Sequence, residues 1–149
     1  LASSIFKNNR RLIAVGSGFE TKNDRSRQSI KLLTYGLTNF DLIEISKKNE
    51  PFDSVEVWLG KSNEVNVYTK KDIYKTIKKG HKKKLKATII YSGPIEAPIK
   101  KDQILAKLKI SYDQKNIEEY DLLARDEVKK INMFSRLIRS LNFLIWGDV

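Results

Sequence analysis

The spacing of hydrophobic residues changes twice along the chain and divides it into three parts. In the first part, the apolar run at residues 11–19 ends at glycines and predicts a short buried strand. Residues 22–40 have apolar positions three or four apart, which predicts a helix with Asn23 or Asp24 as its N-cap. The helix face expected to meet a core carries Ile30, Leu33, Leu37 and Phe40. Gly36 weakens a helix interior by about 1 kcal/mol, so its presence indicates close packing.

In the second part the apolar residues alternate with polar ones, which is the pattern of half-buried strands. The alternating segments are residues 42–45, 55–59, 65–67, 84–91, 104–112 and 117–123, with turn-forming residues between them. Residues 95–99 are not expected to be a central strand throughout, because Pro98 lacks an N–H donor. Short strands at this spacing predict a small antiparallel β-sandwich or barrel.

The third part returns to the helical period from Asp126 onward. On a helical wheel, one arc of roughly 140° holds Ile131, Phe134, Leu137, Ile138, Leu141, Leu144 and Ile145, and Trp146 lies near the end. Lys129, Asn132, Arg136, Arg139 and Ser140 lie opposite this arc, and Lys130 adds a further cation. Residues 128–147 hold four cations and no acid, which suits a helix lying in a membrane interface. A helix packed on its own protein would have the same pattern, so both interpretations stay open.

The chain of 149 residues is strongly basic, with a formal net charge of +11, and this charge favours an anionic partner surface. Most of the cations are Lys, which recognises phosphate and guanine less specifically than Arg does. Residues 70–86 hold nine Lys, and Tyr68, Tyr74 and Tyr91 lie near them, as in some polyanion binders. The alternative is a solvated strand face with a charged loop.

The residues that could carry chemistry do not form a complete site. Cysteine is absent and His81 is the single histidine, so cysteine and histidine-rich metal sites are excluded and no cofactor is expected. Ser4 and Lys7 match S-x-x-K by letters, and residues 140–142 match S-x-N, but the chain has no K-T-G. A working serine site is therefore not expected. No apolar run reaches the ~20 residues that span a bilayer.

Four strings in the chain resemble a known family. They are RLIAVG at residues 11–16, KLLTYGLTNF at residues 31–40, VEVWLGK at residues 55–61, and LKAT at residues 85–88 with PIEAPIKKDQI at residues 94–104. Together they resemble the C-terminal half of the low-molecular-mass D-alanyl-D-alanine carboxypeptidases of the penicillin-binding protein type. Asp102 stands where that family usually has Gly at a turn. The resemblance covers nearly the whole chain.

The resemblance implies an α+β chain of three parts. Residues 1–40 would be the last strand and helix of the penicillin-binding catalytic domain, residues 41–122 a small antiparallel β-sandwich, and residues 123–149 an amphipathic membrane-anchor helix. The nucleophile, its Lys, the S-x-N and the K-T-G would lie upstream of Leu1, so Ser4 would not be the nucleophile and this chain alone would be inactive.

The implied role is a non-catalytic part of a serine-type hydrolase of peptidoglycan biosynthesis and cell shape. It would act at the periplasmic face of the cytoplasmic membrane, attached peripherally to anionic lipid, and would meet peptidoglycan only through the catalytic domain. No nucleic-acid partner is expected. The competing hypothesis is a stand-alone basic β-domain that binds nucleic acid or another polyanion.

Overall fold

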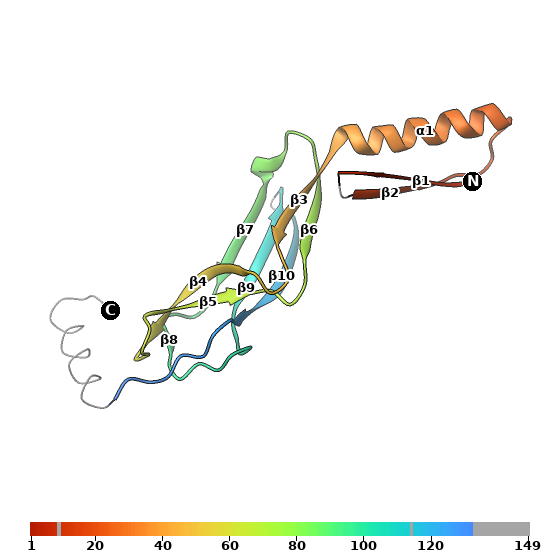
Figure 1. The fold of residues 1–149 in the computed structure, drawn as a ribbon. Coiled ribbons are helices and arrows are strands. Elements are labelled where there is room, and N and C mark those ends of the chain that lie inside the picture. The colour runs from red at the N-terminus through yellow and green to blue at the C-terminus, as the bar shows by residue number, and fades with distance from the viewer. Residues whose placement is uncertain (9, 114, 133–149) are drawn as a thin grey trace. The chain divides into compact units, whose positions relative to one another are not determined.

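The computed structural model describes residues 1–8, 10–113 and 115–132, in which ten strands, one α-helix and one short 3-10 helix are assigned (Figure 1). The elements are β1 (Ala2–Lys7), β2 (Arg10–Val15), α1 (Lys22–Asn39), β3 (Phe40–Ser46), β4 (Pro51–Trp58), β5 (Glu64–Tyr68), β6 (Ile73–Lys78), η1 (Lys82–Lys84), β7 (Leu85–Ile90), β8 (Ile95–Glu96), β9 (Ile104–Tyr112) and β10 (Lys115–Ala124). They form two compact units. The N-terminal unit is Leu1–Ile43 with Tyr74–Lys83, and the sheet unit is Glu44–Ile73 with the chain from Lys84 on.

The N-terminal unit consists mainly of a hairpin and a helix. β1 pairs antiparallel with β2, from Ala2 opposite Val15 to Lys7 opposite Arg10. A Cβ on Gly36 would lie 2.9 Å from Leu12 Cδ1, which confirms the close packing predicted at this glycine. The Arg10 guanidinium donates to the Phe40 carbonyl at 2.8 Å and to the Gly36 carbonyl at 3.2 Å, so β2 holds the end of the helix.

The start of α1 differs from the prediction. The N-cap is Thr21 and not Asn23 or Asp24: Thr21 Oγ1 accepts from the Asp24 backbone N–H at 3.1 Å. The Thr21 hydroxyl also donates to the Asp24 carboxylate at 2.7 Å, so Asp24 occupies the third helical position and supports the cap. Asp24 is a residue type that often caps helices, but here it lies inside the helix, because the Thr21 side chain already accepts from the Asp24 backbone N–H.

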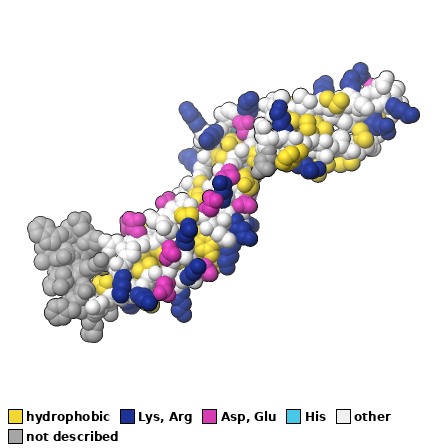
Figure 2. Space-filling model, viewed as in Figure 1, with side chains coloured by type: hydrophobic (Ala, Val, Ile, Leu, Met, Phe, Trp, Pro, Cys, Tyr) yellow, Lys and Arg dark blue, Asp and Glu magenta, His cyan; other side chains and the backbone are white. Residues whose placement is uncertain are grey.

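The predicted burial of this unit is wrong for the described chain. Ile13 and Val15 on β2 are 68% and 76% exposed, and α1 has no buried residue. Figure 2 shows apolar side chains at the surface of this unit. An apolar strand and an apolar helix face therefore meet solvent here, which is unusual for elements with core-forming sequences.

The sheet unit is built on one six-stranded sheet in the order β7-β9-β10-β5-β4-β8. Its pairings are antiparallel except that of β4 with β8, which is parallel. Both halves of the sheet enclose one hydrophobic core, to which β4 contributes Val55 and Val57 and β9 contributes Leu108 and Ile110. These packed antiparallel strands confirm the β-rich, sandwich-like class predicted from the alternation. β8 is only two residues long, as Pro98 led us to expect.

The predicted terminal helix is wrong at its beginning. Val128 is 5% exposed within the core, and it exchanges two backbone hydrogen bonds with Ile99, of 2.8 and 2.9 Å. The Lys61 N–H donates to the Lys129 carbonyl at 2.8 Å, and the Ile131 N–H donates to the Leu59 carbonyl at 3.1 Å. Residues 128–131 are thus extended and complete the sheet unit. Their backbone hydrogen bonds to other segments and the burial of Val128 outweigh the helix propensity of the local sequence. The rest of the predicted helix, with Phe134, Arg136, Leu137, Ile138, Arg139, Leu141, Leu144, Ile145 and Trp146, lies outside the described residues.

Two positions on β9 should respond differently to side-chain truncation. Leu108→Ala removes a side chain with 0% exposure and should lower the free energy of unfolding by about 2–5 kcal/mol. Ile104→Ala, on the same strand at 58% exposure, should change it by less than about 1 kcal/mol. Urea denaturation followed by circular dichroism measures both. Equal losses for the two variants would mean that Leu108 does not lie in the core.

Candidate functional site

Ser4 and Lys7, the letters of a serine-lysine motif, lie on β1 and not on a helix. The S-x-x-K pairing needs one helical turn between the two side chains. In a strand, residues three apart point to opposite faces and are separated by roughly 10 Å along the chain. The structure therefore does not bring Ser4 and Lys7 together. Within the described ranges, no group of three or more His, Asp or Glu side chains could hold a metal ion.

The lysine-rich stretch of residues 70–86 is spread over several elements and over both units. Lys70 and Lys71 lie in the loop after β5, Lys75 and Lys78 lie on β6, and the remaining lysines lie in the turn, in η1 and on β7. Lys84 Nζ is already 3.2 Å from the Asp113 carboxylate. In the view of Figure 2, Lys and Arg are spread over the surface among acidic side chains. The lysines of this stretch thus come from several elements of both units, and a polyanion partner stays an alternative prediction.

Tyr68, one of the tyrosines near the lysine stretch, points into the sheet unit. It is 8% exposed, and its hydroxyl donates to Asp102 Oδ1 at 2.6 Å. Asp102 has a φ of 65°, in the left-handed region that favours Gly and tolerates Asp. This explains how Asp102 replaces the glycine expected at this turn. The hydrogen bond to Asp102, burial and the Asp102 charge all raise the pKa of Tyr68 above its ordinary value of 10.0.

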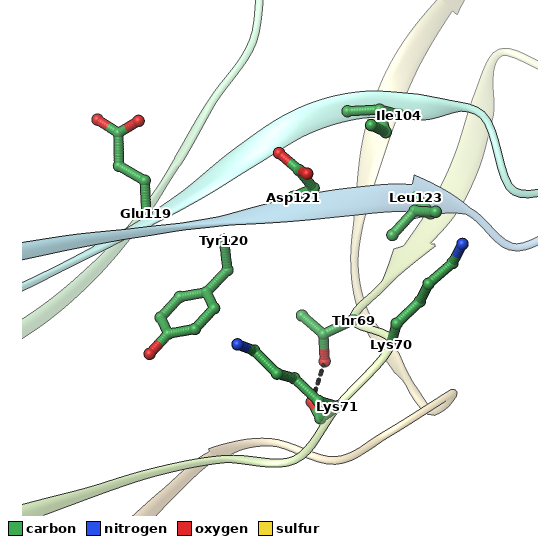
Figure 3. A pocket seen from close by; sticks show the side chains of 8 residues that line it. All are labelled: Thr69, Lys70, Lys71, Ile104, Glu119, Tyr120, Asp121 and Leu123. Carbon is green, nitrogen blue, oxygen red and sulfur yellow. Dashed lines mark hydrogen bonds between the residues drawn. The ribbon is translucent and has the colours of Figure 1, made fainter.

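The sheet unit has an open pocket of about 430 Å³ beside β10 (Figure 3). Its lining residues come from the loop after β5, from β9 and from β10: Thr69, Lys70, Lys71, Ile104, Glu119, Tyr120, Asp121 and Leu123. Neighbouring residues of a strand point to opposite faces. A pocket lined by both Tyr120 and Asp121 must therefore lie at the edge of β10, not over one face of the sheet.

The pocket exists because β5 leaves β10 early. The two strands pair only at Leu123 opposite Tyr68 and at Ala124 opposite Val67. The chain after Tyr68 then turns away through Thr69, whose hydroxyl donates to the Lys71 carbonyl at 3.0 Å. This turn carries Lys70 and Lys71 alongside β10 (Figure 3).

The charges of the pocket lie on opposite sides of β10. Lys71 Nζ lies 4.8 Å from the centroid of the Tyr120 ring, a cation–π contact that positions the ammonium. Glu119 and Asp121 project from the other side of the strand (Figure 3). Glu119 is 3.2 Å from Lys107 Nζ on β9. Lys70 and Lys71 belong to the lysine run noted in the sequence, whereas Tyr120 and Asp121 were missed, since only the strand pairing shows that they meet.

Three of the side chains predicted to contact the membrane, Lys129, Lys130 and Ile131, are described, and they lie at the end of the sheet unit. Lys130 Nζ is 2.7 Å from Glu96 on β8, and Lys129 Nζ is 3.4 Å from Glu127. Ile131 is half-buried and bonded to Leu59. Among the described residues, no helix is long and apolar enough to cross a bilayer.

The comparisons with known proteins identify this arrangement. The family described as "Penicillin-binding protein 5, C-terminal domain" matches residues 40–130, and the chain belongs to this family. D-alanyl-D-alanine carboxypeptidase DacA of Escherichia coli K12 is 33% identical over 139 residues, which are 93% of this chain and 34% of that protein. DacC of the same organism is 32% identical over 92% of this chain and 34% of its own length.

A solved structure supports the same identification. Penicillin binding protein 5 from Haemophilus influenzae is similar with a TM-score of 0.68 and 30% identity, over 87% of this chain and 38% of that one. The resemblance predicted from the four sequence strings is thus confirmed. The chain spans about a third of the length of the relatives it matches.

The raised pKa of Tyr68 predicts how stability depends on pH. A group whose pKa is raised by folding stabilises the fold while it is protonated, and the contribution is lost as pH rises through the raised value. The free energy of unfolding of the wild type should therefore exceed that of Tyr68→Phe by a constant amount below pH 10, and the difference should shrink above it. Urea denaturation between pH 8 and 11 measures this difference.

Asp102→Asn is the matched variant for this measurement, since Asn also tolerates the left-handed backbone but removes the charge. Its stability should show a weaker decline above pH 10 than that of the wild type. A wild-type advantage over Tyr68→Phe that stays constant up to pH 11 would contradict the assignment.

Proposed function

We propose that this chain is the non-catalytic C-terminal portion of a serine-type D-alanyl-D-alanine carboxypeptidase of peptidoglycan biosynthesis, and that it positions the enzyme at the membrane surface. The observation that carries the proposal is where the family's domain ends. The family's domain matches residues 40–130. The basic amphipathic sequence of the predicted anchor continues past residue 130 to Trp146. The activity belongs to relatives about three times as long, so this chain would support the reaction without performing it.

The exposed apolar surface of the N-terminal unit supports a division at about residue 40. Ile13 and Val15 on β2, and Ile30 and Leu32 on α1, are more than half exposed. Apolar side chains gathered at a surface are usually covered by another surface. Full burial of each one contributes roughly 1.5–3 kcal/mol to the stability of the fold. We propose that residues 1–40 belong to the penicillin-binding catalytic domain, whose remaining part provides this cover.

The backbone pairing of residues 128–131 supports a fixed point of attachment for the proposed anchor. Val128 is bonded to Ile99 through both its N–H and its carbonyl, and Lys129 and Ile131 are bonded to residues 59–61. The anchor would therefore begin at a defined place on the sheet unit. We propose that residues 133–146 lie in the interface of the periplasmic face of the cytoplasmic membrane. Arg136 and Arg139 argue against a span, because each would cost roughly 2.5–3.5 kcal/mol at the bilayer centre.

Vesicle binding tests the anchor. Leu137→Asp with Leu141→Asp should release the chain from vesicles that contain acidic lipid, because two side chains that would enter the apolar layer become charged. With about half of the 1.5–3 kcal/mol per side chain lost, the binding constant for the vesicles should fall more than tenfold in a co-sedimentation titration. Raised salt alone should only weaken binding, since each Lys or Arg adds about 1 kcal/mol near an anionic leaflet.

The controls separate apolar insertion from charge. Asn132→Asp with Ser140→Asp adds the same two charges on the predicted polar side, and at raised salt it should bind as the wild type does. A truncated chain that ends at Asn132 tests the whole predicted anchor. It keeps Val128, whose burial in the core makes it necessary for the folding of the sheet unit. If truncation after Asn132 leaves vesicle binding unchanged, the anchor is not in this segment.

The chain should form no penicilloyl adduct. A serine acyl-transfer site needs a base within hydrogen-bond reach of the nucleophile, and Lys7 does not provide this on β1. Mass spectrometry after incubation with benzylpenicillin should therefore show the unmodified mass. A stoichiometric adduct that disappears in Ser4→Ala would show that this chain carries its own nucleophile.

A further inference from the structure

We infer that the pocket beside β10 is a binding site for a short peptide that carries both a free ammonium and a free carboxylate. The pocket holds about 430 Å³ and lies in the low part of the range of ~300–1,000 Å³ that ligand pockets occupy. The inference goes beyond the proposed function and does not depend on it, because it uses only residues of the sheet unit.

The positive end of the site is formed by Lys70 and Lys71. Within the described ranges, no carboxylate lies within ion-pair distance of either ammonium. Lys71 is placed over the Tyr120 ring, a contact that leaves its ammonium protons able to donate. Two cations without a protein carboxylate attract a carboxylate from a ligand.

The negative end of the site is formed by Asp121, with Glu119 beside it. Glu119 is neutralised by Lys107 at 3.2 Å. Asp121 has no hydrogen bond or ion pair from its side chain to another described residue. Its carboxylate accepts only, so a ligand ammonium is the complementary group.

No ion pair joins the two ends of the site in the described chain. Asp121 and Lys71 lie on opposite sides of the β10 backbone, and both line the same pocket (Figure 3). A ligand that bridges them must reach around the strand edge. A peptide advances about 3.3 Å per residue, so a tripeptide separates its two charged ends by about 7–10 Å.

The pocket wall also offers apolar contact for small side chains. Ile104 is 58% exposed at the pocket wall, and Leu123 lies behind it with 5% exposure. The Thr69 hydroxyl is already engaged with the Lys71 carbonyl, so the floor offers mainly apolar contact. Alanine side chains fit this description, and trialanine is therefore the probe.

The test is a nuclear magnetic resonance titration of the full chain with trialanine. Amide shifts should change at residues 69–71 and 119–123, and give a Kd. Because each exposed ion pair is worth about 0.2–1 kcal/mol, Lys71→Met and Asp121→Asn should each raise the Kd by up to about fivefold. Lys86→Met, an exposed lysine of β7 outside the pocket, should leave it unchanged.

Capped ligands assign each end of the peptide. C-terminal amidation should weaken binding to the wild type but not weaken it further when Lys70→Met and Lys71→Met are combined, and N-acetylation should do the same for Asp121→Asn. Equal binding of free and doubly capped trialanine would overturn the inference. So would equal shifts with sodium acetate, which would reduce the site to a general anion site, or a Kd that no pocket variant changes.

Discussion

The sheet unit depends on one shared apolar interior, because all its strands and its last extended segment bury side chains there. Val57, Val67, Leu108, Leu122 and Ala124 have no exposed surface. Since β4 and β5 lie at one half of the sheet and β9 and β10 at the other, these side chains fix how the sheet folds over. The position of β10 is set by this packing. The pocket and the Tyr68–Asp102 contact in turn depend on where β10 meets β5.

The N-terminal unit lacks such an interior in the described chain. Its first strands and its helix have sequences suited to a core, yet only Ala14 among their apolar residues is buried. The unit is held together by specific contacts in place of a buried core. Leu12 packs against Gly36, and Arg10 donates to two carbonyls at the end of the helix. The unit thus combines well-defined local geometry with an exposed apolar surface.

Much of the fold could be predicted from the alternation of residues. β9 has the predicted bounds, and α1 ends one residue before the predicted helix. β6 was missed although Ile73 and Ile77 are only 2% and 4% exposed, because the intervening lysines suggested a charged loop. The helical period was extended too far toward the N-terminus, since nothing local in the sequence shows that Val128 pairs with Ile99. The pocket could not be predicted, because its charged residues come together only through long-range strand pairing.

The bridges at residues 128–131 have a mechanical consequence. Any tension in the chain beyond Asn132 enters the sheet unit through hydrogen bonds to Leu59, Lys61 and Ile99. Those bonds run across the extended segment, so a pull along its axis loads them in shear and distributes the load over several bonds at once. The buried Val128 side chain must also leave the core before the segment can slip. The sheet unit therefore holds residues 128–131 by hydrogen bonds and by the burial of Val128. The force needed to detach this segment should approach the force that unfolds the unit.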